Sequence, residues 1–492
     1  MSQLTKPTAT IPRLQQWLPI TLILCLAIGL YLFQLDTESL AWDEFFSIRD
    51  AKALNPDALR IRPIYYLLLH IWMQLGSGDA WLRGLSVLFS LGSVFLIYRL
   101  GRYLGGKITG LVSALMLTLS PYCIYNAQEV RMYMVSIFFG LTGSLFLSYA
   151  LTKPTHKWMA SWVVARWLAL LTYPLNLFLL LADFSLIVGN YPKKRDILTK
   201  FAAWMSALVI AWFPFANSLR QAASKFTSEW IEIVSPPSLK DAFFYLKIFT
   251  IRWWQLSPPA NFLEQLGKFY LWGYTLMLLG LLIVPFLGKK RFIGLWWALI
   301  WWIVPLGSIF LISQGSESYW VHRYILFTSP YMMIVLAGGF AKLWKNYLQR
   351  VIAITVALVY IIAVIGGLTN YYTVQERTNW RDAVAVIKKQ EQPQDQISVY
   401  AGIDPVSYYY SGKAPIYEIP PTALTVKEEL TPEIIQAALD EMPPIQSRLW
   451  LVYRHRGSKA RHPIMEKVVQ EEFNVDKVWH FTGIDLFLLQ NP

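Results

Sequence analysis

The chain has 492 residues, of which 55% are hydrophobic and only 15% are charged, and its formal net charge is +13. Soluble domains carry about 25% charged residues, so this composition excludes an ordinary soluble protein. Apolar runs of about 17–25 residues, the length that a helix needs to cross a bilayer, recur along most of the sequence. We therefore predict a polytopic α-helical membrane protein.

Most lysine and arginine residues of the apolar region fall in short clusters between the apolar runs. Cytoplasmic loops show this pattern under the positive-inside rule, which accounts for the net charge without a nucleic-acid partner. Placing the basic clusters on the cytoplasmic side predicts eleven spans, with the N-terminus inside and the C-terminus outside. The spans cover residues 17–35, 79–98, 108–125, 131–150, 158–172, 175–189, 199–216, 266–287, 293–312, 325–341 and 351–369.

The composition changes from about Tyr371 onward, where charged residues become common and apolar runs shorten to strand length. Segments 395–402, 448–455 and 484–490 are typical of buried strands, and segments 380–390 and 431–442 are typical of helices. The sequence therefore predicts two domains: a transmembrane domain over 1–370 and a small extramembrane α/β domain over 371–492. An odd number of spans places the second domain on the outer face.

Some motif classes do not occur in the sequence. The two cysteines, Cys25 and Cys123, both lie in apolar runs, so neither a disulfide framework nor a cysteine metal site is expected. The sequence also has no glycine-rich phosphate loop of the nucleotide-binding type.

Two adjacent acids, Asp43 and Glu44, follow the first predicted span within the aromatic stretch WDEFF. Aromatic neighbours favour the membrane interface over bulk water. If residues 42–53 form a helix, one face carries Asp43, Ser47 and Asp50. A carboxylate in a low-dielectric cleft has raised basicity and can accept the proton of a nearby hydroxyl. A catalytic base and a solvated loop are both compatible with this pattern.

A second polar cluster precedes the fourth predicted span. Asn126 and Glu129 fit a capping box, in which Glu129 only begins the helix. Gln128, Arg131 and Tyr133 lie beside them and form a dense polar group at the mouth of a helical bundle. The residues alone favour capping, and a functional site is the alternative interpretation.

Several cations lie on predicted outer loops, where the positive-inside rule does not expect them. Arg60 and Arg62, followed by Tyr65 and Tyr66, fit either a phosphate with a stacked ring or lipid headgroups. His322 and Arg323 precede the tenth span, where Arg323 fits an anionic partner or a helix anchor. Carboxylates on two outer loops, Asp43 and Glu129, are compatible with Mg²⁺ or Mn²⁺, although no spacing demands a metal.

The order of the motifs resembles a known family. WDE at Trp42–Glu44, PIYYLLLH at Pro63–His70, QEVRMY at Gln128–Tyr133 and HRYILFTSP at His322–Pro330 are together similar to bacterial GT-C membrane glycosyltransferases of the family 39 type. These are relatives of the protein O-mannosyltransferases and of the aminoarabinose transferase that modifies lipid A. The resemblance is strongest over residues 35–150 and continues more weakly into the segment Tyr371–Lys388.

The resemblance implies transfer of a sugar from a polyprenyl phosphate to an acceptor hydroxyl outside the cytoplasm, usually with inversion. It implies that Asp43 is the base, that Glu44 assists it, and that Glu129 and Arg131 line the same cavity. His322 and Arg323 match the place where the lipid-linked phosphate is held.

The chain departs from the family at one motif. Relatives often read HPPLYY where this chain has IRPIYY, so the histidine is lost and Arg62 appears one position later. Any role of that histidine cannot be transferred, and we hypothesise that Arg62 contacts the donor phosphate instead.

The sequence thus predicts a membrane glycosyltransferase that acts at the outer face of the cytoplasmic membrane, with membrane lipid around it and a glycan, lipid or protein as acceptor. The alternative is a transporter or flippase of a lipid-linked sugar, which would need acids within the spans. Asp183 is the main acid so placed. A plain anchor for the C-terminal domain needs neither eleven helices nor three charged outer clusters.

Overall fold

The computed structural model describes residues 13–230, 234–251, 262–287, 293–315, 318–400, 402–419, 431–445, 447–455 and 462–490. The chain divides into two compact units. The first, here called the helical unit, comprises Met1–Phe33, Leu54–Gly76 and Trp81–Thr373. The second, here called the sheet unit, comprises Gln34–Ala53, Ser77–Ala80 and Val374–Pro492. The division into domains 1–370 and 371–492 stays a prediction, whereas the units assign two short earlier segments to the C-terminal part.

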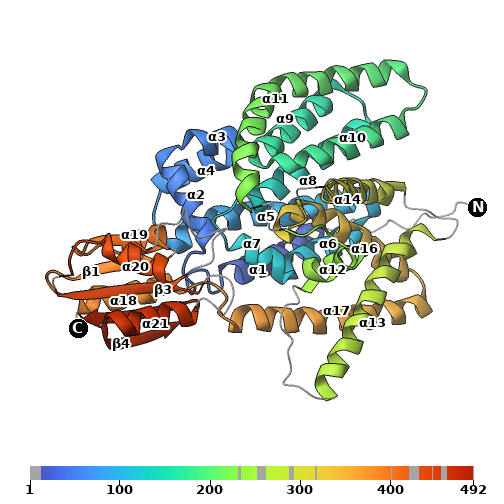
Figure 1. Ribbon diagram of the computed structural model, residues 1–492. Helices are drawn as coiled ribbons and strands as arrows, with labels where there is room; N and C mark the ends of the chain where they lie inside the picture. Colours follow the sequence, from blue (N-terminus) through green and yellow to red (C-terminus); the bar gives the residue numbers. More distant parts are fainter. Residues whose placement is uncertain are drawn as a thin grey trace, which may run out of the picture. The chain divides into compact units, whose positions relative to one another are not determined.

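The described part of the helical unit contains helices and connecting turns, and no strand (Figure 1). Its α-helices are α1 (Arg13–Leu32), α3 (Pro56–Ile61), α4 (Pro63–Gln74), α5 (Asp79–Gly105), α6 (Lys107–Leu119), α7 (Pro121–Ala127), α8 (Tyr133–Thr152), α9 (His156–Thr172), α10 (Leu177–Asn190), α11 (Arg195–Trp230), α12 (Leu239–Ile251), α13 (Phe262–Ile283), α14 (Ile293–Ile312), α15 (His322–Ile325), α16 (Ser329–Leu343) and α17 (Tyr347–Thr373). Short 3₁₀ helices are η1 (Pro174–Asn176), η3 (Val284–Phe286) and η4 (Leu326–Thr328). The first two residues of α5 belong to the sheet unit.

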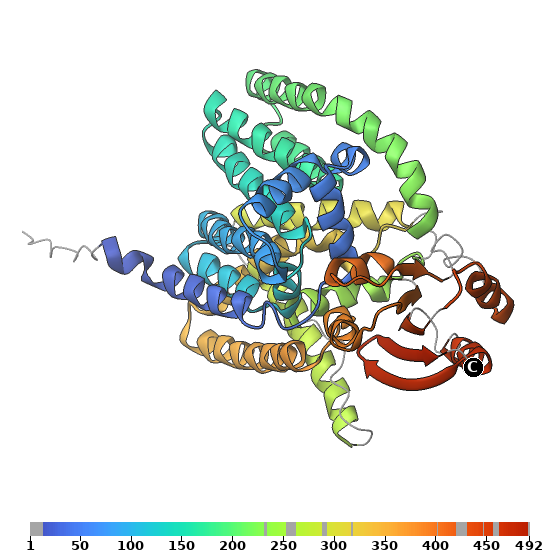
Figure 2. The ribbon, with the colours of Figure 1, turned by 90° about the vertical axis from the view of Figure 1, so that its left-hand side faces the viewer.

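Helices occupy all eleven positions at which spans were predicted. In the described part of the chain, six of them are long and apolar enough to cross a membrane, and a bent pair is a seventh candidate. Shorter apolar helices occur over Trp17–Leu32, Pro174–Asn190 and Tyr270–Phe286. Helix α9 packs against both α8 and α11 (Figures 1 and 2). The chain is a multi-pass membrane protein.

The third predicted span, 108–125, is not a continuous helix. It consists of α6 and α7, which meet at an angle of 65°. Ser120 lies between them with an extended backbone (φ −66°, ψ 114°), because the ring of Pro121 disfavours a helical conformation in the residue before it. Pro121 then occupies the first position of α7, where its missing N–H costs no helical hydrogen bond.

The sheet unit contains a five-stranded sheet with the order β2-β1-β3-β5-β4. The strands are β1 (Gln396–Tyr400), β2 (Ile416–Glu418), β3 (Arg448–Arg454), β4 (Asn474–Phe481) and β5 (Ile484–Gln490). Strand β1 is parallel to β2 and β3, and β5 is antiparallel to β3 and β4. The helices are α2 (Trp42–Ala53), α18 (Trp380–Gln390), α19 (Ile403–Tyr409), α20 (Pro432–Asp440) and α21 (His462–Glu472).

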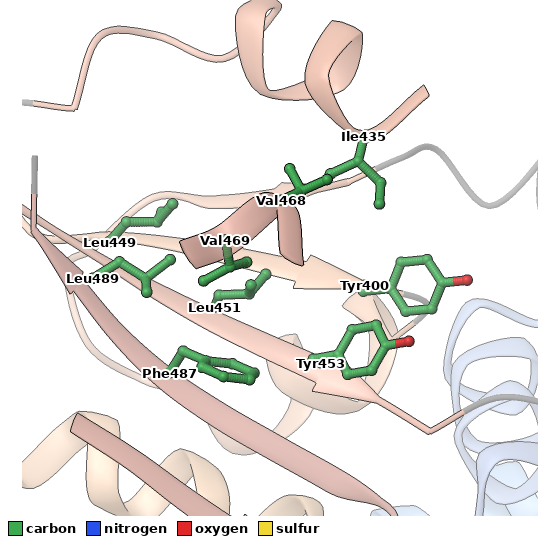
Figure 3. Packing of buried hydrophobic residues seen from close by; sticks show 9 residues of the cluster. All are labelled: Tyr400, Ile435, Leu449, Leu451, Tyr453, Val468, Val469, Phe487 and Leu489. Atoms are coloured by element: carbon green, nitrogen blue, oxygen red, sulfur yellow. The ribbon is translucent and has the colours of Figure 1, made fainter. Parts of the chain in front are cut away.

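The core of the sheet unit explains why its strands are recognisable in the sequence. Strands β1, β3 and β5 bury nearly every residue, as expected for central strands, and all three match the predicted strands. Figure 3 shows side chains of β1, β3 and β5 packed against Ile435, Val468 and Val469. Helices α18 and α20 match the predicted helices as well.

Candidate functional site

The structure places the predicted site residues in both units. The sheet unit holds Asp43 and Glu44. The helical unit holds the others, namely Arg62, Tyr65, Tyr66, Glu129, Arg131, His322 and Arg323.

Arg62 lies at the junction of α3 and α4. Its backbone is not helical (φ −142°, ψ 56°), because Pro63 follows it and begins α4. Its N–H donates to the carbonyl of Ala58, and its carbonyl accepts the N–H of Tyr66. The break between two short helices turns the Arg62 guanidinium over the ring of Tyr173, 5.8 Å from the ring centroid. This distance is within the range of a cation–π contact.

Tyr173 lies at the centre of a group of three tyrosines. Its ring centroid is 6.0 Å from that of Tyr133 and 6.5 Å from that of Tyr324. Arg131 lies over the ring of Tyr133, 5.9 Å from its centroid, and Arg323 lies over the ring of Tyr324, 5.6 Å from its centroid. The tyrosine contacts therefore join segments that are far apart in the sequence, and each ring carries one arginine.

The pKa of the Tyr173 hydroxyl reflects burial first and the surrounding tyrosines and arginines second. Burial raises the pKa of this hydroxyl well above its ordinary value, and Tyr133 and Tyr324 add to the increase. The charges of Arg62 and Arg323 act in the opposite direction on the pKa. The hydroxyl therefore keeps its proton at neutral pH and is available as a donor beside two guanidinium groups.

The turn that carries Glu129 and Arg131 is not a capping box. Asn126 lies inside α7, and its side chain donates to the carbonyl of Tyr122 at 2.7 Å. Helix α8 begins later, with Met132 as N-cap and no side-chain cap bond. The capping interpretation is wrong because the break before Pro121 starts a separate short helix that ends at Ala127.

Buried hydrogen bonds hold this turn in place. The Ser86 hydroxyl of α5 donates to the carbonyl of Glu129 at 2.5 Å and to that of Arg131 at 3.3 Å. The Gln128 side chain donates to the carbonyls of Tyr31 and Phe33 at 3.0 and 2.9 Å, so it ties the turn to the end of α1. Glu129 itself is only 7% exposed.

The remaining predicted residues of the helical unit are Tyr65, Tyr66 and His322, and each makes an aromatic contact of its own. Tyr65 and Tyr66 are both buried on α4, and their rings meet edge to face at 5.3 Å. His322 is the first residue of the short helix α15, and its ring lies 6.0 Å from that of Phe244.

In the sheet unit, the predicted helix over residues 42–53 is present as α2. Asp43 is half-buried in its first turn, and the Ser47 hydroxyl one turn later donates to the carbonyl of Asp43 at 3.2 Å. Glu44 is fully buried, and its carboxylate accepts the N–H of Ala41 at 2.6 Å. An acid at this position of a helix satisfies an N–H that the helix leaves without a partner.

Few of the described side chains are grouped in a way that could ligate a metal ion. Among the residues that the structure describes, no group of three or more His, Cys, Asp or Glu side chains could hold a metal ion. The two candidate ligands, Asp43 and Glu129, belong to different units. The described carboxylates therefore do not by themselves fit a complete metal site.

Asp183, the acid predicted within a span, is one half of a buried ion pair. Arg166 of α9 donates to it through Nε at 2.6 Å and Nη2 at 2.9 Å, and both side chains are 0% exposed. The indole N–H groups of Trp162 and Trp301 donate to the same carboxylate at 2.7 Å. This carboxylate is fully hydrogen-bonded, as a structural group in a membrane bundle must be.

Sequence reasoning missed Tyr173 and Asp79. The one available signal for Tyr173 was its position before Pro174 between two predicted spans, which forces an extended backbone there. Asp79 is 7% exposed and binds Arg381, Tyr408 and Tyr409 of the sheet unit. No local pattern indicates these partners, because more than 300 residues separate Asp79 from each of them.

No family model matches the chain, and no curated protein does. Solved structures do match. ArnT from Cupriavidus metallidurans bound to undecaprenyl phosphate is 14% identical, with a TM-score of 0.55 over 96% of this chain and 98% of that chain. AglB, the oligosaccharyltransferase of Archaeoglobus fulgidus, in complex with an inhibitory peptide and a dolichol-phosphate is 10% identical, with a TM-score of 0.55 over 96% of this chain and 74% of that chain.

The same archaeal oligosaccharyltransferase in complex with Zn and sulfate is 13% identical, with a TM-score of 0.54 over 96% of this chain and 73% of that chain. Identities this low carry information about the fold alone. The matches extend over nearly the whole chain and include both the helical unit and the sheet unit. This multi-pass membrane chain therefore has the GT-C fold of membrane glycosyltransferases.

Proposed function

We propose that the protein transfers a sugar from a polyprenyl-phosphate donor to an acceptor hydroxyl, at the outer face of the cytoplasmic membrane. The observation that carries this proposal is the gathering of three arginines on three tyrosine rings of one unit, in which Tyr173 contacts both of the other tyrosines. The arginines are Arg62, Arg131 and Arg323. Three guanidinium groups and buried hydroxyls are suited to an anion such as a phosphate. The undecaprenyl phosphate in the ArnT structure and the dolichol-phosphate in the AglB structure support the donor class.

The proposed reaction uses these arginines together with Asp43. The acceptor oxygen forms a bond to the anomeric carbon of the sugar, and the bond between that carbon and the phosphate oxygen breaks. The polyprenyl phosphate leaves with the electron pair, and its added charge is stabilised by the arginines. Asp43 takes the proton of the acceptor hydroxyl. Attack opposite the leaving group inverts the anomeric centre.

The other predicted residues have supporting roles in this proposal. Glu44 fixes the first turn of α2 through the N–H of Ala41, so it orients Asp43. Glu129 and Arg131 share a turn held by Ser86. In this proposal the Glu129 carboxylate contacts polar groups of the acceptor or the donor. Tyr65, Tyr66 and His322 shape the donor site. No step of this scheme requires a metal.

A divalent cation, Mg²⁺ or Mn²⁺, is a separate proposal that rests on the Zn complex of the archaeal protein. Treatment with EDTA tests it. A transfer rate that falls on chelation and returns with Mg²⁺ or Mn²⁺ supports a bound divalent cation. A rate that chelation leaves unchanged removes this proposal and leaves the proton transfer to Asp43 untouched.

The test of the donor site is a transfer assay in purified membranes with a panel of labelled polyprenyl-phosphate sugars. Arg62→Ala should raise the donor KM about 10- to 100-fold, because it removes a charge-assisted contact of about 1.5–3 kcal/mol. Arg60→Ala is the matched control, because Arg60 is 58% exposed and pairs with Asp57 at 3.1 Å. An exposed pair of this kind contributes little, so the control should change the donor KM by less than about twofold.

The test of the base is Asp43→Asn in the same assay. The expected result is a loss of kcat of about 100-fold or more with little change in the donor KM, because general-base catalysis contributes about 10²–10⁴-fold. Transfer at the full rate would refute the assignment of Asp43. Absence of transfer from every donor, together with protein-dependent movement of lipid-linked sugar across vesicles, would favour a flippase instead.

A further inference from the structure

We propose that Tyr409 is a positioning residue of the transfer reaction, and that it acts by holding the entry of helix α2. This inference rests on the proposed role of Asp43, which lies in the first turn of α2. Tyr409 lies at the end of α19, outside every predicted motif, and belongs to the same sheet unit as α2.

The Tyr409 hydroxyl makes two hydrogen bonds at the start of α2. It accepts the N–H of Leu40 at 3.0 Å and donates to the Asp79 carboxylate at 2.5 Å. Leu40 is two residues before the first helical residue, Trp42. The next N–H, that of Ala41, is bound by Glu44. Two successive N–H groups before the helix are therefore held by side chains, and one of these side chains comes from α19.

Asp79 extends this connection. Its carboxylate also accepts from Nη2 of Arg381 at 2.5 Å, and the same guanidinium reaches Asp36 at 3.2 Å. Burial and the neighbouring Asp79 raise the pKa of Tyr409 far above its ordinary value, so its hydroxyl remains a donor. The network joins three separate chain segments of the sheet unit.

The body of α2 is held by packing. Its Phe45 ring meets the rings of Tyr408 and Tyr409 edge to face at 5.4 and 5.8 Å. Arg49, one turn further, pairs with Asp404 of α19 at 2.9 Å. Phe45 and Arg49 lie at i, i+4 spacing on one face of the helix, whereas Asp43 and Ser47 lie on another. The α19 contacts thus hold the face of the helix that lies opposite Asp43.

These two kinds of contact have separable effects. Packing of Phe45 and the Arg49 pair keeps α2 on α19, and the Tyr409 hydroxyl fixes where the helix begins. Tyr409→Phe keeps the ring contact with Phe45 and leaves Asp79 with Arg381 as a partner. The folded state should persist while Asp43 loses its exact placement. A displacement of 1 Å in a reacting group can lower a rate about 100-fold.

The experiment compares Tyr409→Phe with Tyr408→Phe in the full-length protein, with the labelled donor that the wild type uses. The Tyr408 hydroxyl is 3.5 Å from Asp79, at the limit of a hydrogen bond, so Tyr408→Phe is the matched control. Tyr409→Phe should lower kcat about tenfold or more with the donor KM within about twofold of wild type. Tyr408→Phe should leave both constants within about twofold.

Thermal unfolding of the detergent-extracted protein separates positioning from stability. A positioning role predicts an unchanged unfolding midpoint for Tyr409→Phe together with the lowered kcat. Wild-type kcat in Tyr409→Phe would overturn the proposal, and so would a loss of kcat that tracks a lowered midpoint or that Tyr408→Phe reproduces.

A charge swap provides a second test should Tyr409→Phe fail to accumulate. Arg49→Asp and Asp404→Arg should each lower kcat, and the double variant should restore it, because the swap rebuilds the pair between α2 and α19. Unchanged kcat in both single variants would overturn the proposal. If the positioning variants keep the wild-type kcat while Asp43→Asn abolishes transfer, the positioning inference fails and the proposed base stands. If Asp43→Asn transfers at the full rate, the proposed base fails instead.

Discussion

The buried pair of Arg166 and Asp183 offers the sharpest test of how the helical unit is held together. Arg166→Met removes the guanidinium and keeps a side chain of similar length. The Asp183 carboxylate then retains only the two indole donors of Trp162 and Trp301. Two further acceptors, the carbonyl of Gly140 and the Ser144 hydroxyl, lose the Arg166 donors that lie 2.7 and 2.8 Å away.

The magnitude follows from the burial of both groups. Because both side chains are 0% exposed, water cannot replace the lost partner. Breaking a buried pair by removing one partner costs about 3–5 kcal/mol, since it leaves an uncompensated charge. Combining Arg166→Met with Asp183→Asn should recover about 1–3 kcal/mol, because the remaining amide is neutral and its oxygen still accepts from the indoles.

The assay is denaturant unfolding of the purified protein in detergent, followed by tryptophan fluorescence and analysed as a double-mutant cycle. Transfer per folded molecule should equal that of wild type, because the pair is structural. Gly143→Ala should lower the stability by less than Arg166→Met does. Its added Cβ would lie 2.9 Å from Nη1 of Arg166 and would crowd the pair without removing it. A loss below about 1 kcal/mol for Arg166→Met, or a double variant no more stable than the single one, would refute this reasoning.

Three other changes test separate parts of the molecule. Tyr173→Phe removes a hydroxyl beside two arginines, so the donor KM should rise about fivefold at unchanged kcat in the transfer assay, and an unchanged KM would contradict a donor role. Ser86→Ala frees the turn at Glu129, so kcat should fall about three- to tenfold in the same assay. Burial alone would raise the pKa of Asp395, but bonds from Arg448 and its neighbours lower it below the ordinary value. The stabilisation that Asp395 contributes is therefore present above about pH 3.9 and is lost as the pH falls through the lowered pKa. Asp395→Asn should remove this acid dependence and lower stability at pH 7, as measured by hydrogen exchange in the sheet unit.

The elements that the sequence predicts correctly are those whose burial follows a local pattern. Long apolar runs predict the helices of the membrane region, because a bilayer demands a fixed length of apolar residues. Strands β1, β3 and β5 are predicted because central strands are apolar on both faces. Strand β4 was missed because it is an edge strand with mostly exposed residues, so its apolar content is low.

The errors arise where a local signal has two structural solutions. Asn126 and Glu129 have the spacing of a capping box, yet Pro121 starts a short helix that already contains Asn126. The outward cations were identified from charge and topology, but nothing in their spacing indicates that Arg62 meets the ring of Tyr173. Such contacts depend on how helices pack, and packing is decided by many side chains at once.

The sequence by itself determines the class of this protein and the positions of its helices and central strands. It also identifies the cationic side chains that could bind a phosphate and the carboxylates that could accept a proton. These properties depend on residue type and on spacing within one element. The tertiary structure decides that Tyr173 lies among the arginines, that Asp183 is neutralised by Arg166, and that α2 folds against α19. These pairings join residues distant in the chain, and only the packed fold brings them within the range of a hydrogen bond or a ring contact.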